Sequence, residues 1–264
     1  MTVAGLAIAI GGIITGLVLE KGNIRDVAQY TAALIVCCGT AGAVMVTTPK
    51  HIIKRAFGEL KHVFYHESIP VEGQVEELIS YVSMARANGV VSLERQAESV
   101  RDPFLRKALS LAVDGSDTEA LVSTMEVHIE QCEARAEETA RVFESGGGYA
   151  PTIGIIGAVL GLIQVMKNLS NIEEIGHGIA VAFVATLYGV GLANLFLLPA
   201  AGKIRHKAAA LRQSQELMLL GVVGVIEGSN PHMLRQKLNA YLVEGQKKTP
   251  QRLRGAAHTM SNVA

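Results

Sequence analysis

The fold is decided by two apolar runs, PTIGIIGAVLGLIQVM at residues 151–166 and IAVAFVATLYGVGLANLFLLP at residues 179–199. Each run is close in length to the roughly 20 residues that a helix needs to cross the hydrocarbon core of a bilayer. Pro151 begins the first run and Pro199 ends the second. We therefore predict a hairpin of two membrane-spanning helices with a proline at each of its cytoplasmic ends.

Small residues recur at helical spacing in both runs. The first run carries Gly154, Ala158 and Gly161, and the second carries Ala182, Thr186, Gly189 and Ala193. In lipid the hydrophobic effect does not favour contact between helices. Helices associate instead through close packing, which small residues allow because they let two backbones approach. We expect these two spans to pack around the helices of a partner protein, and the hydroxyl of Thr186 lies in the middle of the second stripe.

Two further apolar spans lie near the N-terminus, at residues 3–19 and 27–46. They agree with a mean hydropathy of +0.31 and with 49% hydrophobic residues in the chain. No Lys or Arg precedes the first span and no clear cleavage site follows it, so we expect a retained helix rather than a signal peptide. The sequence thus predicts an all-α polytopic membrane protein with four transmembrane helices.

Positive charges indicate the orientation of the spans. Lys54 and Arg55 follow the second span, and Lys203 and Arg205 follow the fourth, whereas the connector at 167–178 carries one Lys against two Glu. Cytoplasmic segments of membrane proteins are enriched in Lys and Arg. We therefore place both termini and the long middle segment in the cytoplasm. The net charge of zero hides this asymmetry.

The segment between the second and third spans is predicted to be a helical cytoplasmic domain. Residues 51–65 mix basic and apolar side chains, which is typical of an amphipathic helix at a membrane surface. From residue 72 the sequence is acidic, and apolar residues recur at helical spacing. A long Glu-rich helix should begin near Thr118 and end at the glycine run 146–148, which we interpret as a flexible joint.

Local signals mark helix ends inside this domain. Asn88-Gly89 predicts the end of a helix, with the glycine in the left-handed backbone conformation. Ser92 is expected to N-cap the next helix. Asp102-Pro103 predicts the start of another helix, which residues 114–117 separate from the long one.

The fourth span is expected to continue as a helix beyond Pro199. Residues 217–226 are apolar but too short to cross a bilayer, so they should pack against the cytoplasmic helices. Residues 232–242 predict a short final helix, and the tail from residue 245 has the composition of a disordered segment. The predicted organisation is 1–48 for the first two transmembrane helices, 49–147 for the cytoplasmic domain, 148–202 for the third and fourth transmembrane helices, and 203–264 for the C-terminal helices and basic tail.

The spans lack the groups that ion transport needs. No Asp, Glu, Lys, Arg or His lies in the body of any of the four spans, whereas proton pumps and carriers place an ionisable group within the membrane. Any titrating carboxylate must therefore come from a partner. Nucleotide-binding, nucleophile-elbow and zinc-hydrolase motifs are missing as well. We expect neither an enzyme nor a cofactor, and no nucleic-acid partner.

His62 and His66 are four residues apart and could share a helix face with Glu59 as metal ligands. No further ligand pattern accompanies them, and histidines at a headgroup interface need no metal. We expect no metal site.

These features together resemble the flagellar motor stator A-subunit family (MotA/PomA type), within the wider MotA/TolQ/ExbB proton-channel group. The resemblance rests on the four spans, the large insert, the runs GGYAPTIGIIGAVLGLI and FVATLYGVGLANLFLLP, and RANGVVSLE in the insert. It covers nearly the whole chain. It implies a ring of five subunits in the bacterial inner membrane around two B-subunits, each with an ion-binding aspartate on one membrane helix and a peptidoglycan-binding domain. Ion flow would turn the ring, whose cytoplasmic domains push the rotor protein FliG.

The resemblance also assigns roles to particular residues. Pro151 and Pro199 match the two family prolines, whose function is the positioning of these helices, and Arg86 and Glu94 match the rotor-facing pair. Each has a purely structural alternative. Proline is favoured in the first turn of a helix, and the two charges lie where they complement helix dipoles.

Three further residues are expected to lie along the ion pathway. Thr186 matches the family's pore-lining threonine, and its alternative is a hydroxyl bonded back to its own helix. Thr152 adds a hydroxyl near the cytoplasmic mouth. Sodium-driven members carry a threonine where this chain has Ala158, and a dehydrated sodium ion needs several oxygen ligands. We therefore expect protons to drive this stator.

Two alternative functions remain open. An energiser of the ExbB/TolQ type would transmit ion-driven motion to an outer-membrane system, but those relatives usually have three spans and this chain also carries RANGVVSLE. A sodium-driven stator would need the partner's helix to supply the ligand missing at Ala158. A self-contained transporter is disfavoured by the lack of charge within the spans.

Overall fold

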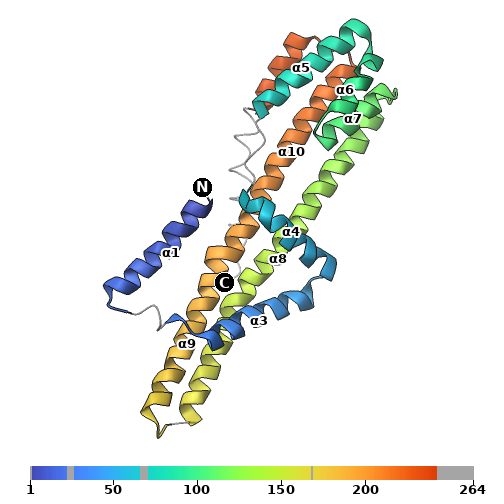
Figure 1. Ribbon diagram of the computed structural model, residues 1–264. Coiled ribbons are helices and arrows are strands. Elements are labelled where there is room, and N and C mark those ends of the chain that lie inside the picture. Colours follow the sequence, from blue (N-terminus) through green and yellow to red (C-terminus); the bar gives the residue numbers. More distant parts are fainter. Residues whose placement is uncertain (1, 23–26, 66–70, 168, 243–264) are drawn as a thin grey trace, which may run out of the picture. The chain divides into compact units, whose positions relative to one another are not determined.

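The computed structural model describes residues 2–22, 27–65, 71–167 and 169–242 (Figure 1). The regular elements in these ranges are all helical: α1 (Thr2–Leu19), α3 (Tyr30–Thr47), α4 (Lys50–Tyr65), α5 (Val71–Asn88), η1 (Val90–Leu93), α6 (Glu94–Ser99), α7 (Pro103–Val113), α8 (Thr118–Lys167), α9 (Ile172–Leu192), η2 (Ala193–Leu197) and α10 (Leu198–Ile226). A final helix covers residues 231–242. The predicted all-α class is confirmed for this part of the chain, and the tail predicted to be disordered lies outside it.

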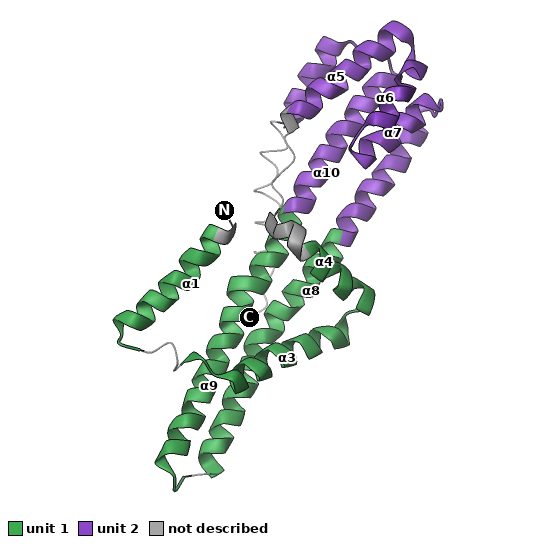
Figure 2. Ribbon diagram, in the orientation of Figure 1, with its two compact units in different colours: residues 1–66, 136–206 green, residues 67–135, 207–264 purple. Residues whose placement is uncertain are grey.

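The helices form two compact units (Figure 2). Unit 1 contains residues 1–66 and 136–206, and unit 2 contains residues 67–135 and 207–264. The long helices α8 and α10 contribute residues to both units. The functional division at residues 48, 147 and 202 stays a prediction.

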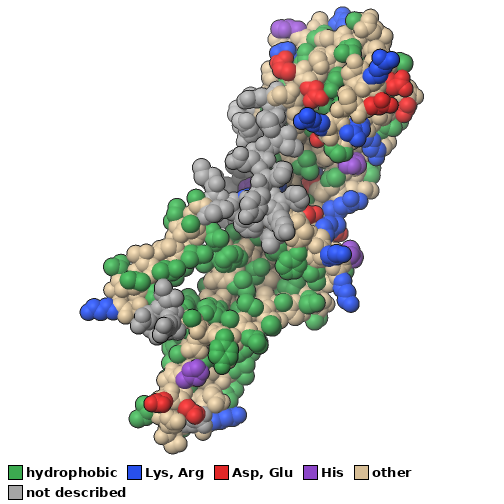
Figure 3. Space-filling view, viewed as in Figure 1, with side chains coloured by type: hydrophobic (Ala, Val, Ile, Leu, Met, Phe, Trp, Pro, Cys, Tyr) green, Lys and Arg blue, Asp and Glu red, His purple; other side chains and the backbone are tan. Residues whose placement is uncertain are grey.

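Unit 1 holds the helices that can cross a membrane. Among the described residues, α3, α8 and the continuous helix Ile172–Ile226 are long and apolar enough, while the apolar part of α1, Ala4–Leu19, is shorter. The visible face of this unit is mainly hydrophobic (Figure 3). Large side chains of unit 1 such as Ile8 and Phe183 are exposed, at 76% and 74%. A surface this apolar is typical of a protein embedded in lipid.

Helix α3 packs on α9 through one buried stripe. The side chains of Ala32 and Val36 are fully buried against α9. The hydroxyl of Tyr188 donates to the carbonyl oxygen of Val27 at 2.6 Å, which ties the segment before α3 to α9. The structure therefore fixes α3 by both packing and a hydrogen bond.

The amphipathic helix predicted at residues 51–65 is α4. Ala56 is fully buried in a cluster that includes Ala140 of α8, while Phe57 on another face is 65% exposed. The guanidinium of Arg55 donates to the carboxylate of Glu138 at 2.6 Å. A small-residue contact and an ion pair thus hold α4 to α8.

Unit 2 has a core of large aliphatic side chains. Its fully buried members include Leu78, Leu93, Leu105, Leu109, Leu121, Met125, Leu217 and Leu238. Burying one such side chain stabilises the fold by about 1.5–3 kcal/mol. The C-terminal end of α10 contributes Leu217, Met218, Val222 and Val225 to this core, so the prediction that residues 217–226 pack against the helices of the middle segment is confirmed. The cytoplasmic location of these helices stays a prediction.

Several predicted helix boundaries of unit 2 are also confirmed. Helix α5 ends at Asn88, and Gly89 follows with φ of +82°, a backbone conformation that favours glycine. The carboxylate of Asp102 accepts two backbone N–H groups of the first turn of α7, at 2.8 and 3.0 Å, which is the capping pattern of a helix start. The long helix α8 begins at Thr118.

The N-cap predicted at Ser92 is wrong. Residues Val90–Leu93 form the 3₁₀ turn η1, and α6 begins only at Glu94. The hydroxyl of Ser92 donates to the carbonyl oxygen of Gly89 at 2.6 Å. Because Ser92 lies inside a helical turn of its own, its side chain faces back along the chain rather than toward the N–H groups of α6.

The flexible joint predicted at residues 146–148 is wrong as well. Helix α8 runs through this glycine run and through Pro151 without a break. A methyl group on Gly147 would lie 2.6 Å from Cδ2 of Leu198, and one on Gly146 would lie 3.3 Å from Cδ1 of Leu197. The glycines therefore allow α8 to pack closely against the helix that follows α9, and this packing offsets their low helix propensity.

Candidate functional site

The third and fourth predicted spans, in α8 and α9, meet backbone to backbone. A methyl group on Gly154 would lie 2.9 Å from the carbonyl oxygen of Ala185, and one on Gly161 would lie 2.7 Å from a carbonyl oxygen of α9. The tightest position is Gly189, where a methyl group would lie 2.5 Å from the carbonyl oxygen of Ala150. Real Cβ atoms essentially never approach so closely. Only glycine fits at these three positions without a shift of the helices.

The two small-residue stripes therefore face each other within one chain. Gly154, Gly161 and Gly189 are buried, and the atoms nearest to each of them belong to the other helix of the hairpin. These glycines are therefore used within the chain, and the packing of the two spans around a partner's helices stays a prediction. In lipid, large side chains gain nothing by moving from lipid to protein, so close backbone contact holds such a hairpin together. The large side chains remain outside, with Ile155 57% and Phe183 74% exposed.

The hydroxyls of the predicted ion pathway lie beside this glycine contact. The hydroxyl of Thr186 donates to the carbonyl oxygen of Ala182 at 3.2 Å, as the structural alternative predicted. A hydroxyl that donates in this way still has lone pairs to accept with. Thr152 is exposed and donates to the carbonyl oxygen of Tyr149 at 2.8 Å. Ala158 is half-buried and contributes only a methyl group.

Pro151 lies in the interior of α8, so the interpretation as a first-turn proline is wrong. Proline removes one backbone N–H and crowds the carbonyl four residues earlier, here that of Gly147. Gly147 itself packs against Leu198, the residue before Pro199. Gly147 lies about one helical turn before Pro151 on α8. The two prolines therefore lie in the same region of the hairpin.

Pro199 follows a wide helical turn. Residues Ala193–Leu197 form the π-helix η2, and the N–H of Leu198 donates to the carbonyl oxygen of Ala193, five residues earlier. Wide turns of this kind accommodate irregularities inside helices and occur frequently at functional sites. The turn lets α9 continue into α10 across a residue that cannot donate its own backbone hydrogen bond.

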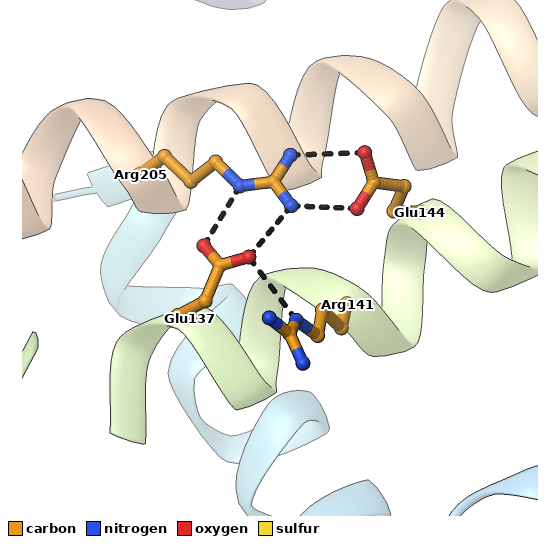
Figure 4. Close-up of polar contacts among 4 residues, drawn as sticks. All are labelled: Glu137, Arg141, Glu144 and Arg205. Carbon is orange, nitrogen blue, oxygen red and sulfur yellow. Dashed lines mark hydrogen bonds and ion pairs between the residues drawn. The ribbon is translucent and has the colours of Figure 1, made fainter. Parts of the chain in front are cut away.

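An ion-pair network lies on the charged part of α8 and α10 within unit 1 (Figure 4). Arg205 donates to both oxygens of Glu137, at 2.9 Å each, and to both oxygens of Glu144, at 3.1 and 2.6 Å. Arg141 donates to Glu137 at 3.3 Å. The two carboxylates are seven residues apart on α8, which is about two turns. One guanidinium therefore clamps two turns of the neighbouring helix.

The network keeps its charges at neutral pH. Hydrogen bonds from Arg205 hold the pKa of both Glu137 and Glu144 below the ordinary value of 4.5, although partial burial acts in the opposite direction. The two carboxylates in turn raise the pKa of Arg205. The cluster is thus a permanent clamp at neutral pH and not a proton relay. Sequence analysis missed it, because nothing in the spacing of two Glu on one helix identifies an Arg more than sixty residues away.

Arg86 and Glu94 occupy an exposed corner of unit 2. Arg86 lies in the last turn of α5 and Glu94 is the first residue of α6, and both are exposed. Leu93 between them is fully buried and fixes the turn to the core, whereas Val91 is 67% exposed. Both charges also complement the dipoles of their helices. Their position suits a contact with another protein.

No group of three His, Cys, Asp or Glu side chains in the described ranges could hold a metal ion. Of the histidine pair considered from the sequence, His66 lies outside those ranges.

The sequence matches two family models and several motility proteins. Residues 3–88 match the family described as "Motility protein A N-terminal", and residues 96–217 match the MotA/TolQ/ExbB proton channel family. Motility protein A of Helicobacter pylori (strain ATCC 700392 / 26695) is 32% identical over 250 residues, which cover 95% of this chain and 97% of that protein. The chain belongs to the motility protein A family.

Solved structures agree with this assignment to the motility protein A family. The structure of C. jejuni MotAB matches with a TM-score of 0.87 and 33% identity, over 91% of this chain and 94% of that chain. The flagellar MotAB stator complex from Bacillus subtilis matches with a TM-score of 0.85 and 33% identity, over 93% and 98%. The chain is thus a stator subunit of the flagellar motor, in a family of ion-channel subunits and in the inner membrane.

Within the motility protein A fold, the predicted site residues fall into two groups. Pro151, Pro199 and Thr186 lie in the hairpin of unit 1, and Arg86 and Glu94 lie at the corner of unit 2. Sequence analysis missed the network of Arg205, the anchor made by Tyr188 and the π-helix. For the π-helix, the one available signal in the sequence was a proline that follows an otherwise unbroken apolar run.

Proposed function

We propose that this chain is the A-subunit of a proton-driven stator that generates torque together with a peptidoglycan-anchored B-subunit of the MotB type. It has four transmembrane helices, with residues 49–147 inserted in the cytoplasm between the second and third and with both termini cytoplasmic. One observation carries the proposal. The α8–α9 hairpin is closed by its own glycines and has no Asp, Glu, Lys, Arg or His in its apolar runs.

A hairpin of this kind can line an ion path but cannot bind the ion alone. Its glycine face is already occupied within the chain, so the exposed apolar side chains of α8 and α9 are the surfaces left for a partner's helices. The carboxylate that accepts the proton then belongs to the B-subunit. Both matching structures are of MotAB, which supports the same partner.

Torque requires an assembly and a rotor contact. We place five copies of the chain in a ring around two B-subunits, with Arg86 and Glu94 of each copy facing the rotor protein FliG. Their exposure at one corner of unit 2 supports this role. Paired charges at such a contact mainly steer and register the partner. Pro151 and Pro199 position the hairpin, which Gly147 and the π-helix support.

The ion pathway includes Thr152, Ala158 and Thr186. Ala158 offers no oxygen, and the hydroxyl of Thr186 already donates to its own helix. A proton needs only one acceptor at a time, whereas a dehydrated sodium ion needs several oxygen ligands. These two observations favour protons. The match of residues 3–88 to the motility protein A N-terminal model favours a stator over an ExbB/TolQ-type energiser.

Proton flux into liposomes tests whether this chain lines the ion path while the B-subunit supplies the proton-accepting carboxylate. Vesicles that contain this chain with its B-subunit should acidify under an imposed potential, while vesicles with either protein alone should not. The matched control replaces the membrane aspartate of the B-subunit by asparagine and should abolish flux without loss of complex. Full-rate flux through this chain alone would contradict the proposal.

Swimming speed tests the choice of ion. A host that lacks its own stators is complemented with both subunits, and speed is measured with and without sodium at fixed ionic strength. We expect speed to be independent of sodium. Speed that follows the sodium concentration and vanishes without it would show that the partner supplies the missing ligands and that sodium is the ion.

A further inference from the structure

A groove on unit 2 lies between α8, α10 and the final helix at residues 231–242. One cavity of about 540 Å³ has Val122, Ile129 and Leu219 among the apolar residues of its wall. A second cavity of about 410 Å³ lies between α10 and the final helix. The two cavities share Leu220 and Val223, which pack against the aliphatic core of unit 2. They therefore form one groove whose apolar floor continues that core.

Two free carboxylates border the first cavity. Glu126 and Glu130 are four residues apart on α8, and both are exposed. Neither makes a hydrogen bond or an ion pair with any part of the chain that the structure describes. Arg212 is the one cation in the described wall of this cavity, and it already pairs with Glu133 and Glu216. The first cavity thus presents two unpaired negative charges beside an apolar surface.

The second cavity has one charge of each sign in its wall. Glu227 and Lys237 both line it, and both are exposed. A ligand of either charge would meet one attractive and one repulsive group there. The preference of the groove for a cationic ligand therefore comes from the first cavity.

The described part of the chain ends at the wall of this groove. Tyr241 lines the first cavity, and its hydroxyl donates to the carboxylate of Glu216. Leu242 is the last residue of this part and packs against the aliphatic core. Residues 243–264 therefore leave unit 2 beside the groove. Arg252 is eleven residues after Tyr241, and a chain of that length can span up to about 36–40 Å, which is ample to reach carboxylates in the same cavity wall.

The segment that follows complements the groove in charge. Residues 245–264 contain no Asp or Glu, and they carry Lys247, Lys248, Arg252 and Arg254. Leu253 lies between the two arginines and is an apolar side chain for the floor of the groove. Charge complementarity mainly gives specificity and register. A short covalent connection adds an effective concentration in the millimolar range, so weak individual contacts are enough to hold the segment.

We propose that residues 247–254 dock in this groove of their own chain, with basic side chains on Glu126 and Glu130 and with Leu253 on the apolar floor. The docked segment covers Leu220 and Val223 and ties the final helix to α8. Because the charges lie at the surface, salt should weaken the docking. The inference concerns unit 2 alone and goes beyond ion conduction and torque.

Trypsin cleavage of the full-length chain tests the docking, because trypsin cuts after the lysines and arginines of residues 247–254. Cleavage of a segment that opens and closes rapidly follows the population of its open form. Mass spectrometry follows the release of the C-terminal peptides at low salt. Glu126→Gln combined with Glu130→Gln should speed this release about fivefold, which corresponds to about 1 kcal/mol and lies in the range of two exposed ion pairs.

The matched control is Glu98→Gln. It removes an exposed carboxylate of unit 2 that does not line the groove, and the release should proceed as in the unchanged chain. At high salt the double variant and the unchanged chain should be cleaved at similar rates, because screening removes the attraction that only the unchanged chain has.

Zero-length cross-linking identifies the occupant of the groove. A carbodiimide joins a lysine amine to a carboxylate that it contacts, so Lys247 or Lys248 should be joined to Glu126 or Glu130. The experiment uses complexes co-assembled from equal amounts of unlabelled and isotope-labelled chains. Each cross-linked peptide should carry a single isotope, because both of its halves come from one chain.

Three results would overturn the proposal. The first is equal release of the C-terminal peptides from the unchanged chain and the double variant at low salt. The second is cross-linked peptides that combine both isotopes, because another copy then occupies the groove. The third is cross-linking of Lys247 and Lys248 only to carboxylates outside the groove. None of these readouts depends on ion flux or swimming, so a failure here is distinguishable from a failure of the proposed stator function.

Discussion

The two units of the chain are held together by opposite kinds of residue. The hairpin of unit 1 closes where side chains are absent, at Gly154, Gly161 and Gly189, and leaves Phe183 74% exposed. The core of unit 2 closes where side chains are large, and Leu78 and Leu109 are fully buried. Figure 3 shows the same contrast on the surface, which is mainly hydrophobic on unit 1 and carries many charges on unit 2.

The solvent accounts for this difference. In water, burying apolar area is the main favourable contribution to folding, so large aliphatic side chains gather inside. In lipid, a leucine side chain is equally well solvated inside or outside the protein, so helices associate through close backbone packing at small residues. The same reasoning predicts opposite sensitivities. Enlarging a residue should break unit 1, and shrinking a residue should break unit 2.

The largest effect is expected for Gly189→Leu in the hairpin. A methyl group at this position would already lie 2.5 Å from the carbonyl oxygen of Ala150, and this backbone atom cannot rotate away. Leucine should force α8 and α9 apart and prevent the folded hairpin from forming. The measurement is the yield of monodisperse protein in detergent and its thermal melting curve.

Gly176→Leu is the matched control on the same helix, because a methyl group on Gly176 meets no atom within 4 Å. It should leave the yield and the melting temperature nearly unchanged. Equal behaviour of the two variants would show that the α8–α9 contact does not depend on its glycines.

The next effect is expected for Leu109→Ala in unit 2. Leu109 is fully buried in the aliphatic core, and removing such a side chain typically costs 2–5 kcal/mol because a cavity remains. Amide hydrogen exchange of the full chain should become faster in α5 and α7 while the α8–α9 hairpin stays protected. Val91→Ala, at a side chain that is 67% exposed, should have little effect. Faster exchange in the hairpin as well would show that the two units unfold together.

A smaller effect is expected for Arg205→Gln, which removes the clamp on Glu137 and Glu144. All three side chains are partly exposed, at 32%, 37% and 46%, so the loss should be about 1 kcal/mol for a bidentate, multi-partner ion pair. Both carboxylates have pKa values below their ordinary 4.5. Their stabilising contribution is therefore present above pH 4.5 and is lost as the pH falls through the lowered values.

Thermal melting at neutral and at acidic pH checks this prediction. The difference between the unchanged chain and Arg205→Gln should be largest at neutral pH and should shrink below pH 4. Arg141→Gln, whose 72% exposed side chain makes a single contact to Glu137, is the matched control and should change the melting temperature less. A difference that grows on acidification would contradict the clamp.

The sequence predicted unit 2 better than unit 1, and the reason is again the solvent. Stop and start signals such as Asn88-Gly89 and Asp102-Pro103 act locally in water, and the structure confirms both. Gly146 and Pro151 carry the same kind of signal but lie inside one unbroken helix. Close packing of Gly147 against Leu198 overrides the local preference there. The glycine stripes were visible in the sequence, but their partner was not, since a small-residue stripe does not indicate which helix it meets.

Site prediction had a similar limit. Arg86 and Glu94 could be placed at an exposed corner because a glycine turn separates two amphipathic helices, and both charges are exposed. The clamp of Arg205 joins residues 61 and 68 positions apart, and no local pattern connects them. The π-helix before Pro199 arises from the backbone of a continuous helix, which side-chain patterns describe poorly.

The smallest effect on stability is expected for Arg86→Glu, which separates folding from function. Arg86 is exposed and its side chain is not part of the aliphatic core, so the change in stability should stay within about 0.5 kcal/mol. Reversing the charge places a carboxylate at the end of α5, which is mildly unfavourable for the helix dipole. Swimming, by contrast, should be lost or severely slowed if this side chain registers the rotor.

Lys107→Glu is the matched control, because it reverses another exposed charge of the same unit, on α7. It should leave both the melting temperature and swimming nearly unchanged. Partial recovery of Arg86→Glu by a complementary charge reversal on the rotor would identify direct pairing, since a change confined to the fold of unit 2 cannot be restored from another protein. If Arg86→Glu instead lowers the melting temperature and the amount of protein in the membrane, the residue acts through its helix and the corner of unit 2 is not the rotor contact.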